Sequence, residues 1–159
     1  MHSYWDDFFA LKGLNDAVYL AGEMKDEAAL RKLTAVRDEF TRDFGNSITA
    51  ALAVHKIDYI PGCADLGDFD ATSTSIALSP AGATNVPEAA LRRTFEIYHD
   101  SMRERVTKND WDAYTPYEAR NIGAFLRLGL PEYAWELIDF LLSHQRPKGW
   151  HVWAEVVAR

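Results

Sequence analysis

The sequence predicts an all-α fold of antiparallel helical hairpins, and three observations support this prediction. Apolar residues recur at steps of three and four along most of the chain, which is the period of an α-helix. Short links join the periodic segments, which favours antiparallel neighbours. No segment alternates between apolar and polar residues as a half-buried strand does. Because 159 residues are a usual size for one domain, we assign residues 1–159 to a single helical domain.

Two long helices are expected in the first part of the chain. The first is expected over Trp5–Met24, with Ser3 in the N-cap position and two acidic side chains in the first turn. The second is expected over Glu27–His55, and the Gly45-Asn46 pair is expected to bend this helix or to divide it.

Proline and glycine residues divide the rest of the chain. Residues 58–70 have the composition of a loop, and a proline in the first turn of a helix marks several of the helix starts that follow. A short helix is expected over Thr72–Leu78, and further helices are expected to begin near Pro87, Pro116 and Pro131. The last segment, Trp150–Arg159, is either a loop or a further helix.

The composition argues against several classes of protein. A net charge of −7 opposes binding to nucleic acid, which requires clustered lysine and arginine. No apolar run is long enough to span a bilayer, and no basic segment precedes an apolar one as in a signal peptide. Cys63 is the one cysteine, so an internal disulfide is excluded. We expect a soluble protein without a cofactor, in the cytoplasm or, after removal of a leader, in the periplasm.

The first stretch that could carry chemistry is Tyr4-Trp5-Asp6-Asp7. An apolar wall raises the pKa of a carboxyl group, and such a group can protonate a leaving oxygen as a general acid. The alternative is a helix N-terminus whose two acids interact favourably with the helix dipole.

The second stretch is acidic and lies around Asp65, Asp68 and Asp70. Three carboxylates could bind Ca²⁺, but the spacing lacks the glycine and the closing glutamate of an EF-hand loop. The better interpretation is that Asp70 or Thr72 caps the following helix. We therefore predict no metal site here.

The third stretch combines two tryptophans with an acid: Trp150, Trp153 and Glu155 follow a Pro-x-Gly turn. Aromatic faces match the C–H face of a pyranose ring, so this stretch resembles the wall of a sugar site. The alternative is tryptophan in the core with glutamate on the surface. Earlier in the chain, Glu118 and Arg120 fall on one helical turn, where an acidic partner for Arg120 is the simplest expectation.

Several of these segments resemble the six-hairpin glycosidases, which are (α/α)6 toroids of the trehalase-like and glucosidase-like kind. Trp5-Asp6 resembles the Trp-Asp pair that carries the general acid of trehalases. The segment 145–150 resembles the Pro-x-Gly-Trp turn that leads into an inner helix, and the segments 70–74 and 117–121 are similar to parts of bacterial toroids of this sort.

The resemblance implies that the chain forms part of such a toroid, with helices for about half of the ring. It places the general acid at Asp6, with Asp7 as the second candidate. The family's base glutamate lies in a Gly-rich segment that this sequence does not reach, so Glu155 is the one acid after the turn that could replace it. The implied substrate-binding residues are Tyr4, Trp5, Asp7, Asp70, Glu118, Arg120, Trp150 and Trp153.

Two functions follow from these observations. The first is an inverting glycoside hydrolase, or a fragment of one, that acts on a carbohydrate substrate. The second is a non-catalytic helical module that binds a partner, or forms a homo-oligomer, through the apolar edge that an open half-ring exposes.

Overall fold

The computed structural model describes residues 1–108 and 111–159, and its architecture is all-α, as predicted. One antiparallel pair of two-residue strands accompanies the helices. The elements are α1 (Tyr4–Glu23), α2 (Glu27–His55), α3 (Ala71–Leu78), α4 (Glu88–Lys108), β1 (Ala113–Tyr114), the 3-10 helix η1 (Pro116–Ala119), α5 (Arg120–Arg127), α6 (Pro131–Ser143) and β2 (Val157–Ala158).

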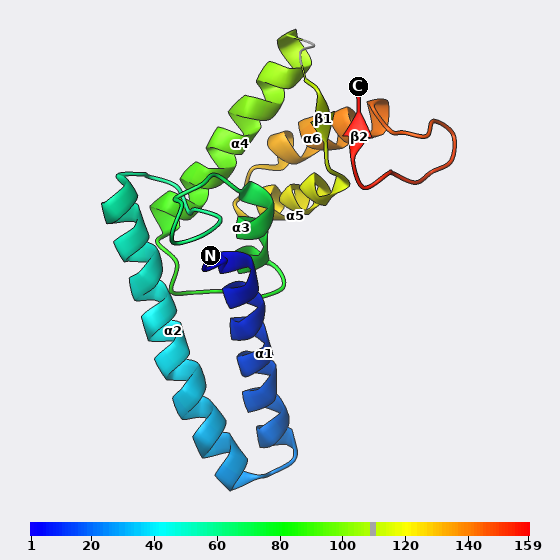
Figure 1. Ribbon diagram of the computed structural model, residues 1–159. Coiled ribbons are helices and arrows are strands. Elements are labelled where there is room, and N and C mark those ends of the chain that lie inside the picture. Colours follow the sequence, from blue (N-terminus) through cyan, green and yellow to red (C-terminus); the bar gives the residue numbers. More distant parts are fainter. Residues whose placement is uncertain (109–110) are drawn as a thin grey trace.

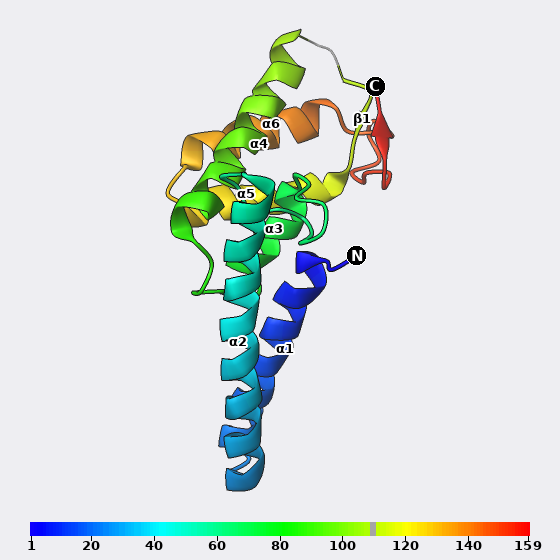
Figure 2. The same cartoon turned by 60° about the vertical axis from the view of Figure 1, so that its left-hand side comes forward.

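The helices form two parts that meet at α3. Figures 1 and 2 both show α1 and α2 as a long antiparallel hairpin that projects from a body formed by α3 to α6. Neither this hairpin nor any other described helix combines the length and the apolar character needed to cross a membrane.

The short helix α3 lies at the centre of the core. Six of its eight residues are buried, and its side chains are mostly small, so α1, α4 and α5 can all approach it closely. Asp70 caps this helix by accepting hydrogen bonds from the backbone N–H groups of Thr72 and Ser73, at 2.9 and 3.0 Å. The predicted N-cap role of Asp70 is therefore confirmed.

The predicted bounds of the second helix are confirmed, but the expected bend is not. Helix α2 is continuous over Glu27–His55, and Asp26 caps its start. Gly45 lies where the segment after α3 crosses the helix: a Cβ at this position would lie 2.9 Å from Nδ2 and 3.0 Å from the carbonyl oxygen of Asn85. This glycine therefore permits a close approach rather than a kink.

The alternative of a last helix over Trp150–Arg159 is wrong. This segment is a loop that ends in β2, where Val157 pairs with Tyr114 and Ala158 pairs with Ala113. Val157 is fully buried, so the packing of one side chain and the backbone hydrogen bonds to β1 hold the tail in place.

A buried ion pair ties α4 to η1. The Nη1 and Nη2 atoms of Arg105 donate to the two carboxylate oxygens of Glu118, at 3.1 and 2.6 Å. The hydroxyl of Tyr98 donates to the same carboxylate. Burial and the neighbouring Glu118 charge both raise the pKa of Tyr98, so this hydroxyl remains protonated and acts as a donor.

The substitution Glu118→Ala is expected to destabilise the fold by about 3–5 kcal/mol, because it leaves the Arg105 charge partly buried without its acid. Denaturant unfolding monitored by circular dichroism measures this loss. The matched control is Glu104→Ala, which removes an exposed pair with Lys108 on the same helix and is expected to cost at most about 0.5 kcal/mol. Equal losses in the two variants would contradict a structural role for the buried pair.

Candidate functional site

The first turn of α1 is held against the loop that precedes α3. The backbone N–H of Tyr4 donates to the carbonyl oxygen of Gly62 at 3.0 Å, and Ser3 pairs with Cys63 as an isolated bridge. The Tyr4 ring is 1% exposed, and its hydroxyl lies 3.0 Å from the hydroxyl of Ser47 on α2. Tyr4, a predicted substrate contact, is thus a core side chain that joins α1 to α2.

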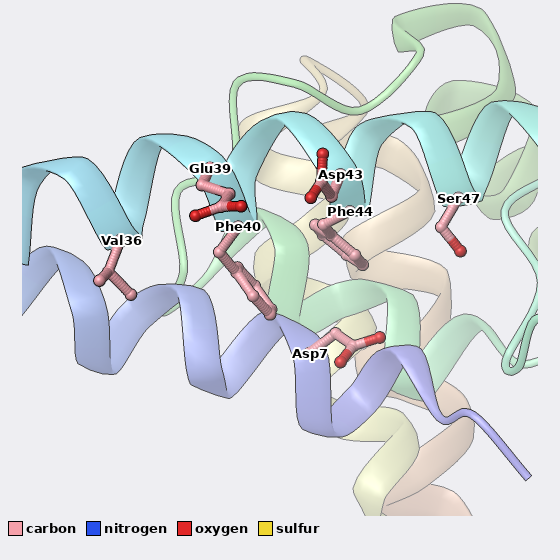
Figure 3. Close-up of a pocket in the computed structure, with 7 residues that line it drawn as sticks. All are labelled: Asp7, Val36, Glu39, Phe40, Asp43, Phe44 and Ser47. Atoms are coloured by element: carbon pink, nitrogen blue, oxygen red, sulfur yellow. The ribbon is translucent and has the colours of Figure 1, made fainter.

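Asp7 lines a groove between α1 and α2. The groove has a volume of about 400 Å³. Figure 3 shows Asp7 on α1 and the rings of Phe40 and Phe44 projecting from α2 toward α1. The lining residues are Asp7, Val36, Glu39, Phe40, Asp43, Phe44 and Ser47. Phe44 is 4% exposed and belongs to the core, whereas Phe40 is partly buried, so the groove combines carboxylates with part of one aromatic ring.

The carboxyl group of Asp7 has a raised pKa. Partial burial is the largest cause, and the charge of the neighbouring Asp6 adds to it. Both effects disfavour the ionised form, so the proton is retained to a higher pH than in a solvated aspartate. This is the direction of shift that a general acid requires.

Two acids of the groove, Glu39 and Asp43, were not predicted from the sequence as site residues. They lie four residues apart on α2 and are both exposed, and Asp43 accepts a hydrogen bond from Nε of Arg42 at 3.0 Å. The sequence spacing could have indicated them. Residues three or four apart lie on the same helix face, and Glu39, Phe40, Asp43 and Ser47 are related by such steps.

On another side of the same turn, Trp5 contacts Arg120 at the start of α5. The guanidinium carbon of Arg120 lies 4.4 Å from the centre of the Trp5 ring and 4.8 Å from that of the Tyr117 ring. The structure thus brings together Trp5 and Arg120, which lie far apart in the sequence. The expected acidic partner of Arg120 is not found, since this arginine forms no ion pair within residues 1–108 and 111–159.

Two other predicted substrate-binding residues already have structural partners. Asp70 caps α3, and Glu118 is bound by Arg105 and Tyr98. In the acidic loop, the carboxylate of Asp65 accepts from the backbone N–H of His2, and that of Asp68 accepts from the N–H of Cys63. Each of these four acids therefore accepts a hydrogen bond from another group of the fold.

The C-terminal tryptophans differ in their surroundings. Trp153 is half-buried, and its indole N–H donates to the carbonyl oxygen of Leu141 at 3.2 Å. Its side chain lines an apolar pocket together with Pro116 and Ala119 of η1. Trp150 is 73% exposed.

The two ends of the chain meet the same part of the fold. Trp5 contacts Arg120 at the start of α5. Trp153 lines one pocket with residues of η1, the helix that directly precedes α5. Figure 2 shows both termini on one side of the molecule. The acids next to these tryptophans, Asp6 and Glu155, are both exposed, and their action as a pair stays a prediction.

Comparison with protein-family models, with curated proteins and with solved structures returned no match. The fold and the groove define an all-α protein in which acidic and aromatic side chains converge on the first turn of α1.

Asp7→Asn is expected to increase the free energy of unfolding at neutral pH. Because the pKa of Asp7 is raised in the folded state, ionisation of this group opposes folding increasingly as the pH rises above its ordinary value of 3.8, and fully once the pH exceeds the folded pKa. The gain should therefore disappear as the pH falls below the ordinary carboxyl value of 3.8, where both states are protonated. Denaturant unfolding at a series of pH values measures the effect.

The control for this prediction is Asp16→Asn, on the same helix. Asp16 forms an exposed ion pair with Lys12, so its replacement should give no gain at neutral pH. If Asp7→Asn were also neutral or destabilising near pH 7, ionisation of Asp7 would not reduce the stability of the folded protein, which would contradict the prediction.

Proposed function

We propose that the protein processes carbohydrate, as an inverting glycoside hydrolase or as part of a helical toroid that has this activity. The observation that carries the proposal is the position of Asp7, whose carboxyl group lines a groove beside the partly buried ring of Phe40 and has a raised pKa. The resemblance of the Trp5-Asp6 pair to the acid-bearing segment of six-hairpin glycosidases supports the same conclusion.

The proposed chemistry divides the work between two carboxyl groups. A protonated acid donates to the glycosidic oxygen as the bond to the anomeric carbon breaks, and an ionised carboxylate on the other face removes a proton from the attacking water. Inversion requires about 6.5–9.5 Å between the two groups, which leaves room for that water. Asp7 is the acid favoured by its burial, and Asp6 is the acid favoured by the family resemblance.

Three carboxylates are candidates for the base. Glu39 and Asp43 line the same groove as Asp7, and both are exposed, as is required of a group that stays ionised in contact with water. Glu155 is the candidate implied by the resemblance; it is exposed in the C-terminal tail and is not among the residues that line the groove. Asp43 is paired with Arg42, whereas Glu39 forms no ion pair with another described residue, so Glu39 is the preferred candidate on α2.

Asp7→Asn is expected to reduce glycoside hydrolysis by about 10²–10⁴-fold, the range that a general acid contributes. The assay uses aryl glycosides and oligosaccharides of several sugars, and NMR identifies the anomer first formed. Asp6→Asn, Glu39→Gln and Glu155→Gln assign the remaining roles, and Asp16→Asn is the control. Hydrolysis of none of these glycosides, or full rates in both Asp6→Asn and Asp7→Asn, would refute the proposed mechanism.

A second candidate function, a helical module that associates through an apolar surface, is favoured by the far end of the α1–α2 hairpin. Near the turn that joins the two helices, Tyr19, Leu20 and Met24 are 65%, 56% and 77% exposed. Neighbouring apolar side chains exposed to this degree are typical of surfaces that bind another protein.

Leu20→Glu is expected to weaken any self-association through the tip of the hairpin, because a charge would be buried in the contact. Light scattering over a range of protein concentrations should show a dimer in the unmodified chain and a monomer in this variant. Val54→Glu places the same charge at an exposed apolar residue of the other end of α2 and should leave the mass unchanged. A monomer at every concentration of the unmodified chain would contradict self-association.

A further inference from the structure

The apolar pocket that Trp153 lines is formed by η1, α5, α6 and the tail, and its volume is about 150 Å³. Each of the seven residues that line it is apolar, and they include Ile122 on α5 and Leu142 on α6. The indole N–H of Trp153 is already bound to the carbonyl oxygen of Leu141. The pocket therefore suits an apolar group, whereas the grooves along α2 and α4 are lined in part by carboxylates.

Exposed apolar side chains extend this surface along both helices. Leu142 lines the pocket and is 57% exposed. Leu126 follows Ile122 by four residues on α5, and Trp135 precedes Ile138 by three residues on α6, so both continue the face that lines the pocket. Both are exposed, and a pocket within such a surface is typical of a site that binds another protein.

The tip of the α1–α2 hairpin, residues 19–27, has side chains that match this pocket. Leu20 and Met24 lie four residues apart, so they project from one helix face as a pair of apolar anchors. An apolar cavity of about 150 Å³ accepts a group of the size of benzene, which is close to that of a leucine or methionine side chain. Figures 1 and 2 both show the turn between α1 and α2 at the end of the hairpin away from α5 and α6, so the tip does not reach the pocket of its own chain.

The tip and the segments that line most of the pocket carry opposite charges. Residues 19–27 contain three acids and one lysine. Residues 119–131 and 140–154 contain four lysine or arginine side chains and no acid, although the whole chain has a net charge of −7. The exposed members of these sets are Glu23, Lys25, Asp26, Glu27, Arg127 and Lys148. Opposite charges favour the encounter of two surfaces and fix their register.

We propose that the pocket binds the hairpin tip of a second copy of this chain. In a dimer with twofold symmetry the exchange is reciprocal: each tip enters the pocket of the other chain, and the two hairpins run antiparallel. The inference rests on the second candidate function, since it names the surface that receives the tip. Leu20 and Met24 are then the apolar anchors, and Leu142 forms part of the wall that they contact.

The first test places a charge in the pocket. Leu142→Glu should raise the dissociation constant of the dimer at least about tenfold, as expected for a residue at the centre of an interface. Sedimentation velocity over a range of protein concentrations measures this constant. The matched control is Leu66→Glu, which replaces a leucine of similar exposure in the loop before α3 and should leave the constant unchanged.

A second pocket variant guards against a loss of folding. Ala119 lines the pocket and is exposed, so Ala119→Glu removes no packed side chain and should weaken the dimer in the same way. Circular dichroism confirms that each variant retains its helices.

The second test mixes a tip variant with a pocket variant. Leu20→Glu and Leu142→Glu are each expected to be monomeric alone. In a mixture, the intact tip of the Leu142→Glu chain enters the intact pocket of the Leu20→Glu chain, so one of the two contacts of the dimer is restored. With a fluorescent label on one variant, sedimentation velocity should detect a mixed dimer at concentrations where neither variant associates alone.

The outcomes separate the inference from the functions proposed above. If Leu20→Glu is monomeric but Leu142→Glu and Ala119→Glu retain the dimer, the tip associates elsewhere: the second candidate function stands and the inference fails. Absence of a mixed dimer from two folded variants also overturns the inference. A monomer at every concentration of the unmodified chain overturns both the inference and self-association. Glycoside hydrolysis is assayed separately, so none of these outcomes decides it.

Discussion

The burial of α3 is the constraint on which the rest of the structure depends. This helix of eight residues contacts α1, α4 and α5, and its small side chains allow all three to pack against it. The α1–α2 hairpin is attached to the body largely through these contacts and through the hydrogen bond from Tyr4 to Gly62. Asp70 caps α3 and so stabilises the element that positions the first turn of α1.

That first turn presents different side chains to different surroundings. Tyr4 faces the core, Asp7 faces the groove against α2, and Trp5 faces Arg120. Successive residues of a helix are separated by about 100°, so one turn can serve several surfaces at once. The groove that Asp7 lines and the contact between Trp5 and Arg120 therefore lie on different sides of the same turn.

Asp7 and the ion pair of Arg105 with Glu118 differ in their effect on the stability of the fold. Partial burial of Asp7 opposes its ionisation and costs stability at neutral pH, which is common where a group is placed for chemistry. The buried pair of Arg105 and Glu118 stabilises the fold instead, because hydrogen bonds between the two groups satisfy both charges and join α4 to η1. Glu118 therefore belongs to the framework that supports the site.

The sequence by itself determined the all-α class, the bounds of α2 and the cap at Asp70, because helix period, proline and capping side chains act over a few neighbouring residues. It also identified Trp5, Asp7 and Arg120 as residues of interest. Only the tertiary structure decided that Tyr4 is buried, that Glu39 and Asp43 share the groove with Asp7, and that Trp5 contacts Arg120. The tail, predicted as a possible helix, pairs with β1 instead. Each of these outcomes depends on which helix faces pack together, and that choice is made by contacts between segments distant in the sequence.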